Sequence, residues 1–165
     1  MAKKMVPPLE DEDFRAIGAV TVNFAALEGL LKFFVWAFIG PDQRTGQIVT
    51  TEYSFRKLRA VALGLVKHRV RDAAMVDKCS LLLTRIGSLE ERRNQITHSS
   101  WSKNKTEKKL VRLKPKLHPS KGWDLTTEWL TVDEVNLVAD QLGEAGAELM
   151  DLLAEIVPPG AGGPP

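Results

Sequence analysis

Apolar positions recur with helical spacing near the start of the chain. Between about residues 12 and 39 they return at steps of three and four, which keeps them on one face of a helix. The positions on this face are Ile17, Val20, Phe24, Leu27, Leu31, Phe34 and Phe38. Gly40 and Pro41 then end the helix, because proline cannot continue it. The pattern predicts one long helix over this stretch.

The opposite face of this first helix is also apolar or small. Its residues are Val22, Ala25, Ala26, Gly29, Phe33 and Trp36. A helix that is apolar on all sides is usually buried on all sides. A chain of 165 residues supplies little protein to cover both faces. We therefore expect a homodimer that packs through the first helix.

The same stretch is long enough to span a bilayer. Its middle, however, contains Asn23, Glu28 and Lys32. Each central charge would cost roughly 2.5–3.5 kcal/mol on insertion. We therefore expect a soluble protein without a membrane span.

Three further helices are predicted, after a loop over about 41–51. The second helix covers about 52–68, with Phe55, Leu58, Ala62 and Leu65 inward and Arg56, Lys57, Arg59 and Lys67 on the other side. The third covers about 71–99, and its apolar stripe is Met75, Cys79, Leu82, Ile86, Leu89 and Ile96. Thr131 and Glu134 fit a capping box that opens the last helix. The stripe of that helix is Val135, Val138, Leu142, Ala145, Leu149, Leu152 and Ile156.

Residues 100–130 follow a different pattern. Val111 and Leu113 alternate with charged residues, and Thr127 and Trp129 stand in a second alternating run. A turn signal at 119–122 separates the two runs. The prediction is a mainly α fold: a four-to-five-helix antiparallel bundle with a short basic β-hairpin before the last helix. The helical domain spans 10–156, between flexible tails at 1–9 and 157–165.

The composition excludes several classes of site. Cys79 is the single cysteine, and no Cys/His cluster has zinc-site spacing. We find no glycine-rich phosphate loop, paired-carboxylate signature or serine-hydrolase elbow. No apolar signal region follows the first lysines. We therefore expect a cytoplasmic protein with no metal and no cofactor.

Arg93 interrupts the apolar stripe of the third helix. A long cation there must reach solvent, pair with a carboxylate, or face a cavity or an interface. Asn94 and His98 follow, four residues apart on one helical face. Arginine, then a polar residue, then histidine after a gap of four resembles the motif of the HEPN superfamily.

This resemblance implies an α-helical bundle that dimerises, so that two copies of the motif face each other. Many HEPN proteins are metal-independent endoribonucleases that leave a 2′,3′-cyclic phosphate, and others are inactive RNA-binding or interaction modules. By resemblance, Arg93 and His98 are the catalytic candidates. A histidine can exchange protons near neutrality, and an arginine offers a planar fork to phosphate oxygens.

Two residues are candidates for supporting roles. Asn94 could hydrogen-bond the phosphate or orient His98. Glu28 could orient Arg93 or act on His98, although a pair with Lys32 one turn away is the simpler interpretation. For the trio of Arg93, Asn94 and His98, the alternative is an arginine paired to a carboxylate and a histidine that caps the helix.

The segment 92–121 contains ten lysines and arginines and one acidic residue, a net charge of +9. Such a segment suits single-stranded RNA. The candidates for RNA contact are Lys103, Lys105, Lys108, Lys109, Arg112, Lys114 and Lys116, with Trp101 as a stacking platform. The alternative is a solvated hairpin whose tryptophans lie in the core.

Three functional hypotheses follow. The first is a homodimeric HEPN-type endoribonuclease, for example a toxin or defence effector with an inhibitory partner protein. The second is a non-catalytic HEPN-like module that binds RNA or a protein. The third is an unrelated helical dimer in which the motif arose by chance.

Overall fold

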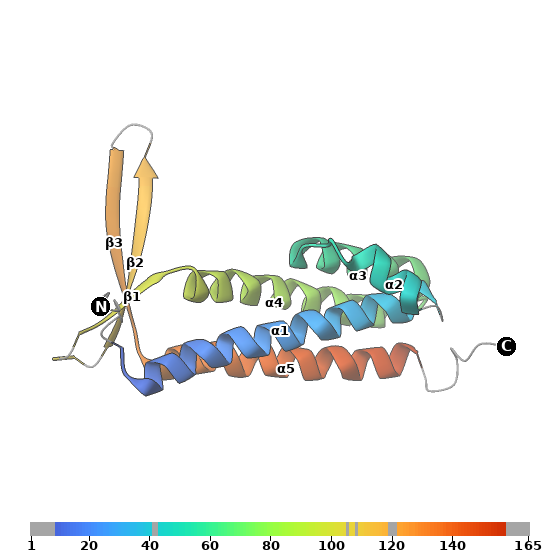
Figure 1. Ribbon diagram of the computed structural model, residues 1–165. Coiled ribbons are helices and arrows are strands. Elements are labelled where there is room, and N and C mark those ends of the chain that lie inside the picture. The colour runs from blue at the N-terminus through green and yellow to red at the C-terminus, as the bar shows by residue number, and fades with distance from the viewer. Residues whose placement is uncertain (1–8, 41–42, 105, 108, 119–121, 158–165) are drawn as a thin grey trace.

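The computed structural model describes residues 9–40, 43–104, 106–107, 109–118 and 122–157. Its helices are α1 (Asp11–Ile39), α2 (Gln43–Thr50), α3 (Phe55–Arg69), α4 (Ala73–Thr97) and α5 (Val132–Ile156). Its strands are β1 (Ser100–Asn104), β2 (Lys109–His118) and β3 (Gly122–Leu130), which lie between α4 and α5 (Figure 1). The predicted mainly α bundle with a hairpin before the last helix is confirmed.

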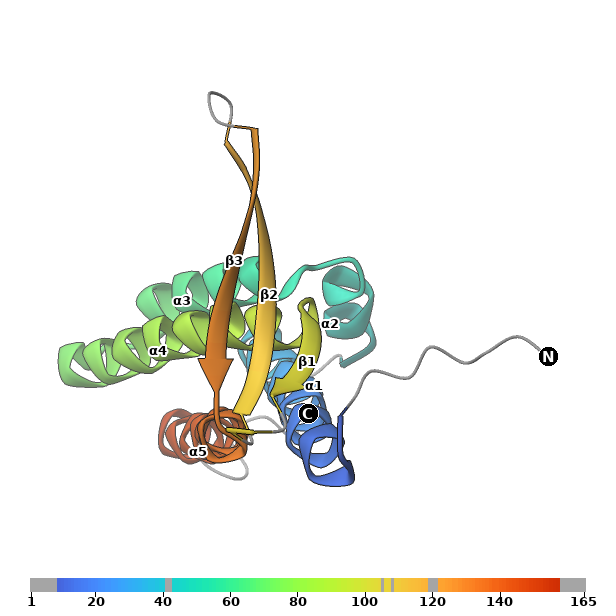
Figure 2. The same ribbon diagram turned by 90° about the vertical axis from the view of Figure 1, so that its left-hand side faces the viewer.

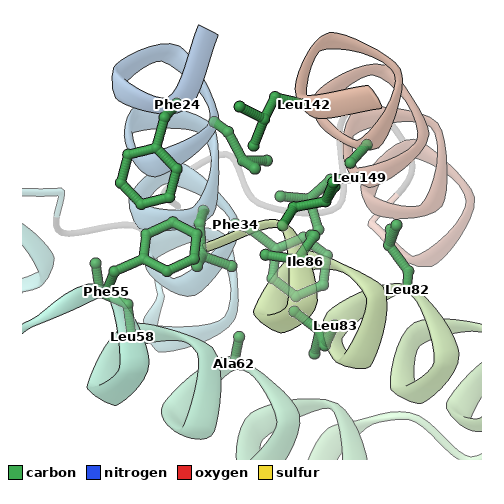
Figure 3. Close-up of a cluster of buried hydrophobic side chains, with 14 of the residues drawn as sticks. Phe24, Phe34, Phe55, Leu58, Ala62, Leu82, Leu83, Ile86, Leu142 and Leu149 are labelled. Carbon is green, nitrogen blue, oxygen red and sulfur yellow. The ribbon is translucent and has the colours of Figure 1, made fainter. Parts of the chain in front are cut away.

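The three long helices lie side by side, and α3 packs against α1 and α4 (Figures 1 and 2). The starts of α1 and α5 and the end of α4 all lie at the sheet, so α4 runs opposite to the other two. Leucine, isoleucine and phenylalanine side chains from four helices fill the centre (Figure 3). The largest of them include Leu27, Phe34, Leu58, Leu83, Ile86, Leu142 and Leu149. The apolar stripes of the sequence therefore meet in one core.

The prediction of a loop over 41–51 was wrong for residues 43–50, which form α2. Tertiary contacts hold this short helix. The indole Nε1 of Trp36 donates to Thr50 Oγ1 at 2.8 Å, and Thr50 is buried. Gly46 lies so close to Trp36 that an added Cβ would stand 2.8 Å from its ring. Helical periodicity gave no sign of α2 because only eight residues take part.

The predicted capping box at the start of α5 is confirmed. The Thr131 hydroxyl accepts from the Glu134 backbone N–H at 3.1 Å. The Glu134 carboxylate in turn accepts from the Thr131 backbone N–H at 2.7 Å. These two bonds satisfy donors that the first turn of a helix leaves free, so the sequence signal fixes where α5 begins.

The predicted hairpin is part of a three-stranded antiparallel sheet in the order β1-β2-β3. The strand β1 was not predicted; it pairs with the base of β2, with Trp101 opposite Arg112 and Lys103 opposite Leu110. Beyond that base, β2 and β3 continue as a two-stranded ribbon that projects away from the helices (Figure 1). The predicted turn at 119–121 and most of the predicted tails lie outside the described residues.

The two apolar faces of α1 have different surroundings. The inner stripe from Val20 to Phe38 is buried. On the outer face, Val22 is 66% exposed and Phe33 40% exposed, and Ala25, Ala26 and Gly29 are also exposed. By length and composition alone, α1 could also cross a membrane, and a third (33%) of its most apolar window is buried in the bundle.

Candidate functional site

Arg93 lies where α4 meets α1 and the start of α3. Its guanidinium carbon stands 4.2 Å from the centre of the Phe24 ring of α1. The Phe24 ring is in turn 4.5 Å from the ring of Phe55, the first residue of α3, and the two rings point toward one another (Figure 3). The anomalous cation of the apolar stripe is therefore half-buried and stacked on an aromatic side chain.

Arg93 has few polar partners among the described residues. Its Nη1 donates to Asn94 Oδ1 at 2.8 Å, and its Nε is buried without a hydrogen-bond partner. No described carboxylate forms an ion pair with it. Asn94 thus contacts Arg93 and not the His98 ring in this structure. A half-buried guanidinium without a counter-charge is suited to bind an anion.

His98 is the residue that ends α4. Its backbone N–H donates to Asn94 O at 3.1 Å, and its side chain is exposed. It lies five positions after Arg93, which corresponds to about 140° around an ideal helix. Accordingly, Arg93 turns toward the core while His98 is exposed, and no hydrogen bond joins the two side chains within the described part of one chain.

Glu28 is not a partner of Arg93. Its carboxylate forms an ion pair with Lys32 at 2.8 Å, one turn along α1. The simpler of the two interpretations of Glu28 is the one that the structure supports. No ion pair joins Glu28 to Arg93 in the single chain, and its role in orienting the motif stays a prediction.

Lys103 is the first of the predicted RNA contacts, and its surroundings argue against that role. Its side chain is only 4% exposed, and its ammonium group contacts Glu10 at 2.7 Å, Asp13 at 3.1 Å and Glu12 at 3.2 Å. The hydrogen bond to Glu10 chiefly raises the pKa of Lys103; burial opposes this shift, and the bonds to Asp13 and Glu12 add to it. Lys103 is therefore a charged anchor between β1 and the start of α1, inaccessible to a phosphate.

Arg112 and Lys114 share one carboxylate. Both contact Glu128 of β3, the lysine at 2.5 Å, and the Arg112 side chain is only 3% exposed. Arg112 also donates to Gln95 of α4 at 3.2 Å. The hydrogen bond from Lys114 is the main cause that holds the pKa of Glu128 below its ordinary value, with a smaller contribution from Arg112. Arg112 therefore anchors the ribbon to the bundle, whereas Lys114 pairs within the ribbon.

The other hairpin candidates divide into two groups. Lys109 forms an exposed ion pair with Glu107 at 3.6 Å. Lys105 and Lys108 lie outside the described residues, as does the side chain of Lys116. The described part of the hairpin therefore carries much less uncompensated positive charge than its sequence indicates.

Trp101 follows the alternative interpretation of a tryptophan in the core. Its indole Nε1 donates to Ile96 O at 2.8 Å, and its ring packs against the hydrophobic core. It is not a free stacking platform. Trp123 and Trp129, which lie on β3, are 67% and 45% exposed.

Sequence reasoning assigned no role to Arg59 of α3. Its Nη1 donates to Leu83 O of α4 at 3.2 Å, and its Nε is buried without a partner. The signal that could have found it is the charge of α3, which carries five lysines and arginines and no acidic residue.

Within the described part of the chain, no group of three or more histidine, cysteine or acidic side chains could hold a metal ion. Comparison with known proteins gives no match to any protein-family model, curated protein or solved structure. The resemblance to the HEPN superfamily therefore depends on Arg93, Asn94 and His98 at the end of a long helix and on the helical pattern of residues 10–156.

Proposed function

We propose that this protein is a metal-independent endoribonuclease of HEPN type, active as a homodimer in the cytoplasm. Arg93 and His98 of both copies would form one composite site. The observation that carries the proposal is the Arg93 guanidinium, which is half-buried between helices without a carboxylate among the described residues. A dianionic phosphorane is a ligand that such a group would stabilise.

The roles of the residues follow from their chemistry. The exposed imidazole of His98 would take the proton from the 2′-hydroxyl, and its counterpart in the second copy would protonate the leaving 5′-oxygen. The bond from Arg93 to Asn94 fixes the guanidinium, so Asn94 would act as a positioning residue. The product would be a 2′,3′-cyclic phosphate.

The outer face of α1 supports the homodimer. Val22 and Phe33 expose apolar surface in the single chain, and the residues between them are small or form the Glu28–Lys32 pair. A second copy packed there would remove this surface from water. It would also supply a second His98, since one copy has only one motif histidine.

The test is cleavage of mixed-sequence RNA in EDTA by the purified full chain. We expect cleavage by the wild type, and its loss in His98→Ala and in Arg93→Ala. His68→Ala is the matched control, since His68 is also exposed but lies at the end of α3. Cleavage by His98→Ala at the wild-type rate would refute the catalytic assignment.

One observation favours a second candidate, a non-catalytic module that binds a protein. The described cations of the hairpin are paired to carboxylates, whereas Trp123 and Trp129 are exposed on its β3 strand. Exposed tryptophans are more typical of protein interfaces than of solvated surface. This candidate predicts no RNA cleavage by the wild type under any condition.

A further inference from the structure

The helix α3 carries positive charge that the described carboxylates do not neutralise. Its five cations are Arg56, Lys57, Arg59, Lys67 and Arg69, and it contains no acidic residue. None of the five forms an ion pair within the described part of the chain. The cations of the hairpin, by contrast, are paired where they are described. The helix α3 thus presents a basic surface that no described carboxylate neutralises.

Arg59 is held in place on α4 by a specific fit. Its guanidinium lies against Gly87, where an added Cβ would stand 1.8 Å from Nη1, so the contact requires a residue without a side chain. The Nη1 donates to Leu83 O, while Nη2 forms no hydrogen bond with a described residue and is not buried. The group therefore keeps a free donor at a fixed position.

A groove runs beside this guanidinium, with a volume of about 210 Å³. It is lined by Arg56, Arg59, Ala60, Leu63, Leu83 and Thr84. Two arginines and a threonine thus stand beside three apolar residues. This combination suits a phosphate group, because an arginine fork binds phosphate oxygens in pairs.

The start of α3 connects the groove with the proposed site. Phe55 precedes Arg56 in α3, and its ring contacts Phe24, on which Arg93 is stacked. Glu90 and Glu91 lie on α4 between the groove residues and Arg93 in the sequence, and neither forms an ion pair among the described residues. Their carboxylates would repel phosphates from that part of α4, so a chain of phosphates would have to pass from Arg93 along α3.

We propose that the groove between α3 and α4, with Arg56 and Arg59, binds backbone phosphates of single-stranded RNA that flank the phosphate at Arg93. This inference rests on the proposed function for the identity of its ligand. It makes α3, and not the hairpin, the main electrostatic contact with RNA.

The test is binding of a fluorescein-labelled single-stranded RNA of mixed sequence, measured by fluorescence anisotropy across a range of salt. The full chain carries His98→Ala to prevent cleavage. We expect Arg56→Ala to weaken binding roughly tenfold, because it removes one charge-assisted hydrogen bond. The plot of log affinity against log salt has a negative slope, and its magnitude should decrease by about 0.7 for each phosphate that the variant no longer neutralises.

Two further variants separate charge from folding. Arg59→Lys keeps the charge but removes the fork, so we expect weaker binding with unchanged helical circular dichroism. Arg15→Ala is the matched control, since Arg15 is an exposed arginine of α1 without an ion pair among the described residues. Equal affinities and slopes for Arg56→Ala, Arg15→Ala and their parent would overturn the inference.

The outcomes separate this inference from the proposed cleavage. RNA binding that depends on α3, in a wild type that does not cleave RNA, would support the groove and refute the nuclease. Cleavage that depends on His98, with no effect of Arg56→Ala on RNA binding, would support the nuclease and refute the groove. Competition by polyglutamate as strong as that by unlabelled RNA would indicate an acidic peptide ligand and overturn the inference.

Discussion

At the scale of single residues, two cations that look alike in the sequence have opposite surroundings. Arg93 interrupts an apolar stripe and stacks on Phe24 without a carboxylate partner among the described residues. Lys103 stands in a basic segment and contacts three carboxylates. A buried charge with partners is structural, whereas one without them is free to bind a ligand.

Asp13 is the residue of the Lys103 cluster on which stability should depend. It is fully buried, and its carboxylate accepts both from Lys103 and from the Glu10 backbone N–H at 2.7 Å. We expect Asp13→Ala to lower the free energy of unfolding by about 3 kcal/mol, because it leaves the buried ammonium short of charge and removes a cap. Urea unfolding followed by circular dichroism measures this.

Glu12→Ala is the control, because the Glu12 side chain is 62% exposed and contacts the same ammonium. We expect it to lower the free energy of unfolding by less than about 1 kcal/mol. Equal effects of the two substitutions would mean that Asp13 does not anchor the start of α1.

At the scale of elements, α2 and the ribbon depend on contacts remote in sequence. The helix α2 lies against Trp36 through Gly46 and Thr50. The ribbon is anchored at its base by Arg112, which reaches Gln95 and Glu128. An isolated two-stranded ribbon is only marginally stable in water, so this anchor decides whether the ribbon keeps its direction.

Two glycine substitutions with opposite expected effects on the free energy of unfolding test the packing of α2 on Trp36. Gly46→Ala would place a methyl group 2.8 Å from the Trp36 ring, so we expect a loss of roughly 1–3 kcal/mol in the free energy of unfolding. Gly64→Ala in α3 meets nothing within 4 Å and should stabilise by up to about 1 kcal/mol. Thermal unfolding of both variants checks this, and a stabilising Gly46→Ala would contradict the packing.

At the scale of the whole molecule, the other helices cover one face of α1 and leave the opposite face exposed. The inner stripe is buried by α3, α4 and α5, while Val22 and Phe33 remain exposed. The proposed homodimer would cover this outer face and add the Arg93 and His98 of the second copy to the site.

Val22→Glu should convert the proposed dimer into a monomer, because it places a charge in the apolar contact. Size-exclusion chromatography with light scattering measures the mass. Leu137→Glu on α5 is the matched control, since Leu137 is also an exposed aliphatic residue. It is 50% exposed, against 66% for Val22. A monomeric wild type, or a dimeric Val22→Glu variant, would contradict the proposed interface.

The sequence by itself determined the long helices, their order, the capping box of α5 and the anomaly of Arg93. Periodicity and capping are local, so a single segment carries the whole signal. The prediction of homodimeric HEPN-type cleavage stays a proposal. Arg93 and His98 lie on different sides of α4 within one chain, so a shared site would need a second copy.

Only the tertiary structure decided which cations are free. Asp13, one of the partners of Lys103, precedes it by 90 residues. No local sequence pattern connects β1 with the start of α1. The sequence therefore made the cations of the hairpin candidates for RNA contact, while it assigned no role to those of α3. In the described residues it is the hairpin cations that are paired and the α3 cations that are not, because a charge is neutralised by what lies near it in space and not by its neighbours in the chain.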